Sequence, residues 1–551
     1  MSLRPVNAVV VGSGAGGGIV AKQLAEAGLS VVLLERGKWY GPFDDRKDDL
    51  HNQTVPALGN AFGPDEDRNW RVAVDWQGKE SVVHPSDFTY LNNAGCVGGG
   101  TLCYGAMAWR FMEKDFRMRS TYGAVAGSTL EDWPISYAEL EPFYEKAEWE
   151  VGVSGDDSGN PFKAPRQRSL PMPPLPPGRE HQILEPAARR LGLHPFHIPM
   201  LRNSVPYNGR AACMRCRWCC GYACEVDAKS GTQNTVIPIA LKTGNCELRT
   251  ECVAKEILTN DQGRVTGVAY FDAAGRLQEQ PSDLVVVSAS ATESPRLLLN
   301  SKSPLFPNGL GNRYDWVGRN LHAHMYVGAS GVFELETYDD LGPGASIAVC
   351  DYNHGNPGVI GGGLLANQFI RTPYQLTGMH PPGAGWGSAH KDFMREAFKK
   401  NVVVMGPVQE MPVFTARVQV DSQIKDYWGI PVARLSGYRH DNDQMVGDFL
   451  AGKAAAWLQE AGAISIKKLQ YGPPKTLSGV QHQAGTCRMG NDPQTSVVDK
   501  YCRVHDVDNL YVIDGSVHVT TGGFNPVLTI MAIAYYASDN LVKTWKGTHG
   551  R

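Results

Sequence analysis

The sequence lacks an apolar run long enough to span a membrane, and it carries no large excess of charge of either sign. Its longest apolar candidates, such as residues 528–537, fall short of the roughly 18 residues that a membrane-spanning helix needs. Lys and Arg together number 53 against 56 Asp and Glu, which gives a formal net charge of -3. A basic surface for nucleic acid or an anionic membrane is therefore not expected. We expect a small-molecule partner, no membrane span and no nucleic-acid complex.

The composition also excludes disordered and fibrous chains. Hydrophobic residues make up 42% and charged residues 20% of the 551 positions, which is typical of a globular protein with a large core. The first residues show none of the charged, apolar and cleavage regions of a secretory signal, because a strand pattern begins at Asn7. We expect a cytoplasmic protein, while periplasmic export in complex with a signal-bearing partner subunit stays open.

The most informative local pattern is a strand, a glycine-rich turn and a helix at the start of the chain. Residues 7–11 are β-rich, residues 19–27 have helical periodicity, and a second apolar strand at 30–34 ends in Glu35. Between them, Gly12-x-Gly14-x-x-Gly17 is typical of a dinucleotide-binding turn: the first glycine makes the turn, the second lets the pyrophosphate approach, and the third lets the helix pack on the strand. Glu35 is placed to accept hydrogen bonds from a ribose. The turn does not separate FAD from NAD.

The rest of the chain alternates between strand-like and helical segments. In the last third, strand-like runs at 417–420 and 509–513 lie among helical runs at 445–460 and 526–541. The proline-rich segment 170–178 predicts an extended surface connector. This alternation predicts an α/β unit interleaved with a mixed second unit.

Motifs near the C-terminus indicate which of the two cofactors, FAD or NAD, the chain binds. A segment that begins His482-Gln483-Ala484-Gly485-Thr486 precedes a strand ending in Ile513-Asp514-Gly515, and Gly522-Gly523-Phe524-Asn525-Pro526 follows. Together with a glycine loop at 92–101 and segments at 132–144, 290–298 and 317–321, they make the chain resemble the glucose-methanol-choline (GMC) family of flavin oxidoreductases over nearly its whole length. Through residues 101–111 and a cysteine-rich segment it is most similar to bacterial members that oxidise pyranoses and glycosides.

The resemblance implies both a fold and a domain organisation. The fold class is α/β, with a discontinuous Rossmann-like FAD-binding domain interleaved with a mixed α+β substrate-binding domain. The expected FAD-binding domain comprises residues 1–125, 205–325 and 470–551. The expected substrate-binding domain comprises residues 126–204 and 326–469.

The resemblance also implies that the cofactor is FAD. Some family members attach the flavin through a histidine of the glycine loop, but Cys103 stands at that place here, so we expect non-covalent FAD, with a thioether to Cys103 as the alternative. Asp514 lies in the family's C-terminal flavin segment. The residues expected to bind FAD are Gly12, Gly14, Ala15, Gly17, Glu35, Gly98, Gly99, Thr101, Cys103, Tyr104, Asp514, Gly515, Asn525 and Pro526.

By the same resemblance, His482 and Asn525 are the catalytic residues. Alcohol oxidation removes a hydroxyl proton and a carbon-bound hydride, and an imidazole is the side chain best suited to accept the proton near neutral pH. Asn525 would hold the hydroxyl oxygen and the developing alkoxide by hydrogen bonding, and flavin N5 would accept the hydride. His322 and His324 have no evident mechanistic partner in the sequence, so structural roles are predicted for both.

A dense cysteine cluster offers a second redox hypothesis. Five of the 12 cysteines lie between residues 213 and 224, a ligand supply that suits an iron-sulfur centre or zinc. The spacing differs from that of cluster-bearing family members, and Glu225 replaces the proline that follows the last ferredoxin cysteine. We favour no metal over an iron-sulfur cluster. The candidate ligands are Cys213, Cys216, Cys219, Cys220 and Cys224.

These observations predict an FAD-dependent oxidoreductase that oxidises a sugar or glycoside at a secondary ring hydroxyl, C2 or C3, to a ketone. Gln409, with His482 and Asn525, is the expected substrate contact; Glu410, Trp386 and Trp428 are further candidates. The electron acceptor is expected to be oxygen, a quinone or a redox protein. Two alternatives stay open: an iron-sulfur dehydrogenase subunit that passes electrons to a cytochrome, and a redox-silent lyase on the same fold.

Overall fold

The computed structural model describes residues 3–44, 62–91, 93–369, 373–377, 380–469, 475–478 and 481–549. Asn92 of the expected glycine loop lies outside these residues. The helices are α1 Gly17–Glu26, α2 Gly100–Cys103, α3 Met118–Tyr122, α4 Tyr137–Ala147, α5 Arg179–Arg190, α6 Val236–Lys242, α7 Ser290–Asn300, α8 Pro373–Thr377, α9 Gly387–Ala397, α10 Asp441–Glu460 and α11 Val527–His549.

The strands fall into three larger sheets and one two-stranded ladder within the described residues. They are β1 Val6–Val11, β2 Val31–Leu34, β3 Arg71–Val74, β4 Glu80–Val83, β5 Ser154–Asp156, β6 Phe196–Met200, β7 Cys246–Arg249, β8 Val253–Thr259, β9 Val265–Phe271, β10 Leu277–Val287, β11 His322–His324, β12 Tyr326–Val332, β13 Ile347–Val349, β14 Leu365–Asn367, β15 Asn401–Pro407, β16 Arg417–Lys425, β17 Pro431–Ser436, β18 Ser465–Leu469, β19 Gln481–Ala484 and β20 Leu510–Val512.

A parallel sheet brings the two ends of the chain together. Its order is β7, β2, β1 and β10, with β20 on the other side of β10. Val11, Val287 and Val512 lie in register at the ends of β1, β10 and β20. The strand core of β1 is almost completely buried, as expected for a parallel strand covered on both faces. The residues after these strands therefore meet at one edge of the sheet.

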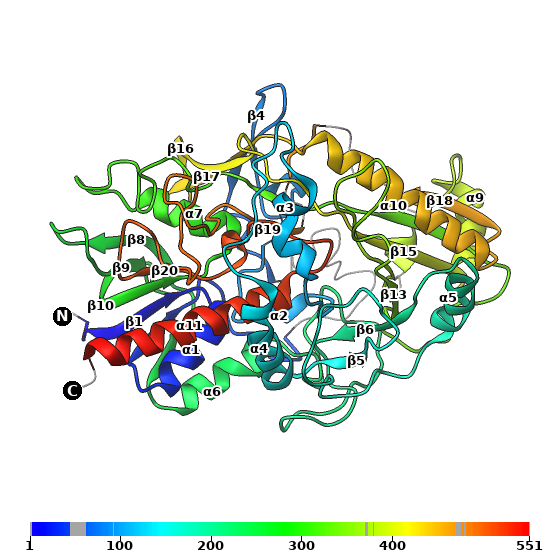
Figure 1. Ribbon diagram of the computed structural model, residues 1–551, viewed down its shortest axis with the longest axis horizontal. Helices are drawn as coiled ribbons and strands as arrows, with labels where there is room; N and C mark the ends of the chain where they lie inside the picture. Colours follow the sequence, from blue (N-terminus) through cyan, green and yellow to red (C-terminus); the bar gives the residue numbers. More distant parts are fainter. Residues whose placement is uncertain are drawn as a thin grey trace.

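Helices α1, α6 and α11 pack together beside the parallel sheet, and both termini lie at the same end of the molecule (Figure 1). Gly28 follows α1 with φ +91°, a left-handed conformation that favours glycine and ends the helix. The predicted strands and helices at this end of the chain are confirmed to within a few residues.

A second, antiparallel sheet lies at the opposite end of the molecule (Figure 1). Its order is β18, β12, β15, β14, β13, β6 and β5, and α10 and α5 pack against it. Trp457 of α10 is completely buried and donates a hydrogen bond to the carbonyl of Leu184 in α5 (2.9 Å). Because both helices bury apolar side chains over this sheet, it has a core of its own.

The four-stranded sheet joins segments that were expected to belong to different domains. In it, β3 pairs in parallel with β17, and β4 and β16 flank them. The expected domain bounds place β3 in the FAD-binding part and β17 in the substrate-binding part. The bounds themselves stay a prediction.

A buried ion-pair network holds the segment between α2 and α3 in place. The guanidinium of Arg110 donates to both carboxylate oxygens of Glu148 (2.8 and 2.7 Å) and to Glu141 (3.0 Å). Its side chain is 3% exposed and that of Glu148 is 1% exposed. The preceding residue, Trp109, donates a hydrogen bond to Asn525 (3.0 Å), so this network also fixes the position of that contact.

We expect Arg110→Met to lower the free energy of unfolding by about 3–5 kcal/mol, because it leaves buried carboxylates without their main partner. Urea titration of the purified variant measures this loss. Arg189→Met is the matched control: Arg189 pairs with Glu185 on the surface, where such a pair contributes less than about 1 kcal/mol. Equal midpoints for the two variants would contradict the role given to Arg110.

Candidate active site

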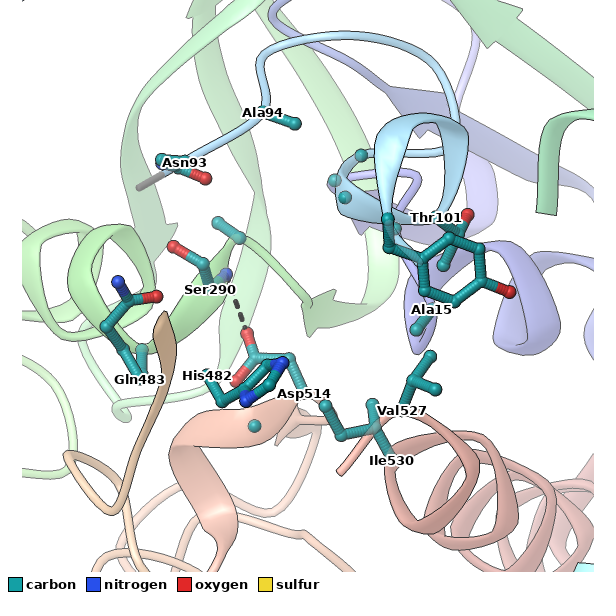
Figure 2. Close-up of a pocket in the computed structure, with 18 of the residues that line it drawn as sticks. Ala15, Asn93, Ala94, Thr101, Ser290, His482, Gln483, Asp514, Val527 and Ile530 are labelled. Carbon is teal, nitrogen blue, oxygen red and sulfur yellow. Dashed lines mark hydrogen bonds between the residues drawn. The ribbon is translucent and has the colours of Figure 1, made fainter. Parts of the chain in front are cut away.

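One large cavity of about 590 Å³ lies at the carboxyl edge of the parallel sheet. Its walls come from distant parts of the chain, and Figure 2 shows Ala15, Thr101, Ser290, His482 and Val527 around it. The structure places most of the predicted FAD-binding residues in these walls: Gly12, Gly14, Ala15, Glu35, Gly99, Thr101, Cys103, Tyr104, Asp514, Gly515, Asn525 and Pro526.

The glycine turn after β1 is packed on one side and open on the other. A Cβ on Gly17 would lie 1.9 Å from the carbonyl oxygen of Gly12, so only glycine lets α1 pack this closely on the turn. A Cβ on Gly14, in contrast, would meet no protein atom within 4 Å. The turn therefore presents bare backbone to the cavity at Gly14, beside the first turn of a helix, which is the arrangement that binds a pyrophosphate.

Glu35 lies at the end of β2 in a network that the sequence did not reveal. Its Oε2 accepts hydrogen bonds from the backbone N–H (3.1 Å) and hydroxyl (2.6 Å) of Ser13, and its Oε1 accepts one from the N–H of Gly37 (2.9 Å). Burial raises the pKa of Glu35, and these hydrogen bonds oppose that rise. The N–H of Gly98 donates to the Ser13 hydroxyl (3.1 Å), so Ser13 connects the acid to the glycine loop.

The glycine loop packs directly on the turn. A Cβ on Gly99 would lie 3.2 Å from Cα of Gly14, and Gly99 has φ +51°. Thr101 donates its hydroxyl to the carbonyl of Gly98 (2.6 Å), which closes the loop into α2. Gly17 and Gly98 do not line the cavity. Gly17 lets α1 pack closely on the turn, and the N–H of Gly98 donates to the hydroxyl of Ser13.

Cys103 faces the cavity as a buried thiol. Burial raises its pKa above the usual range, so the reactive thiolate is disfavoured at neutral pH. This environment supports the prediction of non-covalent flavin over a thioether at Cys103.

Asp514 connects the C-terminal segment to α7. Its Oδ2 accepts from the N–H of Ser290 (3.0 Å, dashed in Figure 2) and from the hydroxyl of Ser294 (2.6 Å), and its Oδ1 accepts from the N–H of Ser516 (2.8 Å). Ser290 has φ +89°, an uncommon conformation for a residue with a side chain. The Asp514 carboxylate thus ties the start of α7 to the C-terminal segment that lines the cavity.

His482 is brought to the cavity by a short irregular ladder. It lies on β19, which pairs with β11, and the register shifts between His322 and His324. Such a register shift changes the direction in which side chains point, as a β-bulge does. His482 itself has φ +61°, a left-handed backbone conformation that costs on the order of 1–3 kcal/mol for a residue other than glycine. His324 also lines the cavity, with its Nδ1 3.0 Å from Nδ1 of His482.

The sequence predicts a structural role for His324, and the structure places its ring in the cavity wall against His482. The ladder supplies a partner that no sequence spacing reveals, because residues 324 and 482 meet only after folding. His322 is buried, and its Nδ1 contacts the carbonyl of Asn320 (2.7 Å), a structural arrangement.

The amide of Asn525 is held in one orientation. Its Oδ1 accepts from Nε1–H of Trp109 (3.0 Å), and its Nδ2 donates to the hydroxyl of Tyr326 (2.6 Å). The ring of Tyr326 lies 5.9 Å from that of His482, centroid to centroid. The structure thus places His482 and Asn525 around one tyrosine, with the amide nitrogen carrying a second N–H for another acceptor.

His482 is neutral at physiological pH in this setting. Burial lowers its pKa to about 4, so an unprotonated nitrogen is present to accept a proton over the whole neutral range.

The structure does not bring the predicted sugar contact Gln409 to this cavity. Gln409 is buried, and its Nε2 lies 3.4 Å from Oδ1 of Asp115. Glu410 accepts a hydrogen bond from the N–H of Ala323 (2.9 Å) and supports β11. Trp386 is 85% exposed, and Trp428 does not line the cavity either. Gln368, Phe369 and Met405 stand at the cavity instead.

The predicted cysteine cluster folds around a much smaller space. Four of its members surround a void of about 10 Å³, enough for roughly one water molecule, together with Arg202 and Lys229. Among the described residues, no three His, Cys, Asp or Glu side chains are arranged to hold a metal ion. Cys220 lines the large cavity, and burial raises its pKa to about 12. The geometry gives no support to an iron-sulfur centre or zinc. The small void is lined by Cys213, Cys216, Cys219 and Cys224.

Two family models, both described as GMC oxidoreductase, match the chain: the N-terminal model matches residues 15–326 and the C-terminal model residues 412–534. The chain belongs to the GMC oxidoreductase family. The predicted family and α/β fold are confirmed. As a GMC flavin oxidoreductase it acts on CH–OH groups of alcohols or sugars, and its cofactor is FAD.

Relatives cover nearly the whole of this GMC oxidoreductase. The chain is 31% identical to 2-methyl-1,2-propanediol dehydrogenase of Mycolicibacterium austroafricanum over 98% of its own length and 95% of the relative. It is 29% identical to the gluconate 2-dehydrogenase flavoprotein of Pantoea cypripedii, over 97% and 93%. The fold of pyridoxine 4-oxidase from Mesorbium loti matches with a TM-score of 0.63 and 16% identity, over 97% of this chain and 98% of that one. No helix in the described part of the chain could cross a membrane.

The cavity fits FAD on the evidence of its own residues. The open side of Gly14 admits a pyrophosphate against the backbone. The buried carboxylate of Glu35 keeps lone pairs for a ribose hydroxyl although Ser13 and Gly37 already donate to it. Both groups lie in the cavity that His482 and Asn525 also line, so the adenosine end and the reacting end of the cofactor share one space.

A pair of glycine substitutions should separate folding from FAD binding. Gly17→Ala forces a Cβ against the Gly12 carbonyl, and we expect a loss of about 1–3 kcal/mol in the free energy of unfolding. Gly14→Ala adds a methyl group only to the open cavity, so stability without FAD should be unchanged while the bound FAD per chain falls. Thermal unfolding and the flavin absorbance of the purified proteins measure both. Full FAD content in Gly14→Ala would contradict this placement of the pyrophosphate.

A buried histidine behind the site should make the fold acid-sensitive. His518 is fully buried, neither ring nitrogen has a partner among the described residues, and burial lowers its pKa to about 3. In the unfolded chain this histidine takes up a proton near pH 6.5, whereas in the folded protein it stays neutral at that pH. Its contribution to the free energy of unfolding is therefore fully present above pH 6.5 and is lost as the pH falls below that value. At pH 5 this one group costs about 2 kcal/mol.

We therefore expect His518→Phe to lose less stability than the wild type between pH 7 and pH 5 in urea titrations. Phe111 and Trp133 pack around this ring, so an aromatic replacement is compatible with the core. The control, exposed His84→Phe, should retain the wild-type pH dependence. Parallel behaviour of all three proteins would show that His518 does not set the acid sensitivity.

Proposed function

We propose that this GMC oxidoreductase oxidises a secondary ring hydroxyl of a sugar or glycoside, at C2 or C3, to a ketone. The observation that carries the proposal is the placement of His482 and Asn525 around Tyr326 in the same cavity as the glycine turn. A proton acceptor and a hydrogen-bond donor thus face one space that a cofactor and a small substrate can share. The predicted division into FAD-binding and substrate-binding domains belongs to the same proposal.

In this proposal His482 acts on the proton of the substrate hydroxyl group and Asn525 acts on its oxygen. Neutral His482 accepts the hydroxyl proton, which places negative charge on the oxygen. Asn525 donates its remaining N–H to that oxygen and stabilises the charge; Trp109 prevents the amide from turning its acceptor toward the substrate. When bound, FAD supplies the acceptor for the hydride that leaves the carbon.

Two features support a sugar or sugar acid as the substrate. Its relatives include the gluconate 2-dehydrogenase flavoprotein and the fructose dehydrogenase large subunit of Gluconobacter japonicus, which is 27% identical over 98% of both chains. Two glutamines, Gln368 and Gln483, line the cavity. The amide of Gln368 donates to two backbone carbonyls, which leaves its oxygen to accept from a substrate hydroxyl.

The electron acceptor in this proposal is oxygen, a quinone or a redox protein. An iron-sulfur dehydrogenase subunit is not favoured, because no three of the described cysteine, histidine or acidic side chains are arranged to hold a metal. No contact among the described lining residues favours a redox-silent lyase over oxidation.

Anaerobic titration tests the proposed function directly. Aldoses, ketoses, sugar acids and glycosides are added to the oxidised holoenzyme without oxygen, and the flavin absorbance is followed. We expect at least one sugar to bleach the flavin and its product, identified by NMR, to be a keto sugar at C2 or C3. Bleaching only by simple alcohols would overturn the sugar assignment, and no bleaching by any alcohol would overturn oxidation altogether.

We expect His482→Ala to retain FAD while the rate constant for flavin reduction falls about 10²–10⁴-fold, because the proton acceptor is lost. Stopped-flow absorbance with the best sugar measures this change. His84→Ala, a change at an exposed histidine, should reduce at the wild-type rate. A normal reduction rate in His482→Ala would remove this residue from the mechanism.

A further inference from the structure

Two histidines in the cavity wall form a chain of hydrogen bonds that ends on a backbone carbonyl. Nε2 of His324 lies 2.9 Å from the carbonyl oxygen of Gly522, and Nδ1 of the same ring lies 3.0 Å from Nδ1 of His482. His324 is 1% exposed. Both nitrogens of this ring are therefore engaged, one with each neighbour.

The position of each proton in this chain follows from counting donors. A carbonyl oxygen can only accept, so Nε2 of His324 carries a hydrogen and donates it to Gly522. A neutral imidazole carries one N–H, so Nδ1 of His324 is an acceptor. The facing Nδ1 of His482 must then be the donor, and Nε2 of His482 is left with its lone pair.

The opposite assignment requires an imidazolium at His324. Nδ1 of His324 could donate to His482 only if both of its nitrogens carried hydrogens. Burial and the neighbouring His482 ring lower the pKa of His324 well below its usual range, and the carboxylate of Glu410 accepts from the N–H of the adjacent Ala323. Rotating the ring of His324 by half a turn would place carbon atoms against both partners and lose both hydrogen bonds.

We propose that His324 is a positioning residue that fixes His482 as the Nδ1–H tautomer, so that Nε2 of His482 is the atom that accepts the substrate's hydroxyl proton. The inference rests on the proposed function for its consequence, but the tautomer itself is a property of the protein alone. The paired strands β11 and β19 hold the two rings together, and their planes are nearly perpendicular at 79°. Without this partner, the imidazole of His482 would divide between its two tautomers, and one of them has no lone pair on Nε2.

The test compares two substitutions at His324 that are close in volume and differ chiefly in polarity. His324→Gln retains an acceptor and a donor on one planar group, and can bond both His482 and Gly522. His324→Leu has a similar volume and neither polar atom. Both holoenzymes are first checked for FAD content and thermal unfolding, so that a variant that fails to fold is recognised.

The first readout is the ¹⁵N NMR spectrum of histidine-labelled holoenzyme without substrate, with the His482 signals identified by their loss in His482→Gln. We expect wild type and His324→Gln to show a protonated Nδ1 and an unprotonated Nε2, and His324→Leu to show a mixture. A wild-type His482 protonated on Nε2 would overturn the proposal, as would an unchanged spectrum in His324→Leu.

The second readout is the reduction of the flavin by the sugar found in the anaerobic titration. The limiting rate constant should fall about 10- to 100-fold in His324→Leu, because part of His482 takes the unreactive tautomer and its ring also loses the hydrogen bond that orients it. The half-saturating sugar concentration should be unchanged, and His324→Gln should recover most of the rate. Equal rates in Leu and Gln variants would overturn the role of polarity. If no alcohol reduces the wild-type flavin, the proposed function fails while the NMR result still decides the tautomer.

Discussion

The parallel pairing of β10 with both β1 and β20 is the constraint on which the site depends. Val287 aligns with Val11 on one side and with Val512 on the other. Because the three strands end at the same level, the glycine turn, the loop before α7 and the segment carrying Asp514 emerge at one edge. A cofactor held there by the first residues of the chain is in reach of side chains from the last hundred.

The chemistry proposed for the site depends on how its side chains are oriented. Trp109 and Tyr326 hold the Asn525 amide from its two ends, and His324 bonds His482 on the side away from its proposed reacting nitrogen. The left-handed backbone of His482 and the irregular ladder around it cost free energy. The buried Arg110 network fixes the adjoining segment that carries Trp109. Rigid placement of this kind lets a donor act on developing charge without reorganising.

The residues that contact the substrate were the hardest feature of the protein to predict from its sequence. Gln409 and Trp386 are residue types that bind sugars, yet one is buried behind the cavity and the other projects from the surface. The cysteine cluster has the density of a metal site, but its described geometry encloses space for about one water molecule. Residue type and spacing predict what a side chain could bind; they do not predict which way it faces once several segments pack together.

The sequence by itself determined the dinucleotide turn, the helix that follows it and the acid after β2, because these depend on local spacing between residues 7 and 35. It also determined the family, through ordered motifs along the whole chain. The tertiary structure alone decided the roles of Ser13 and His324, since each acts through a partner brought near by strand pairing or loop packing. The contacts that set a proton's position lie between residues 158 apart in sequence, a separation at which local patterns carry no information.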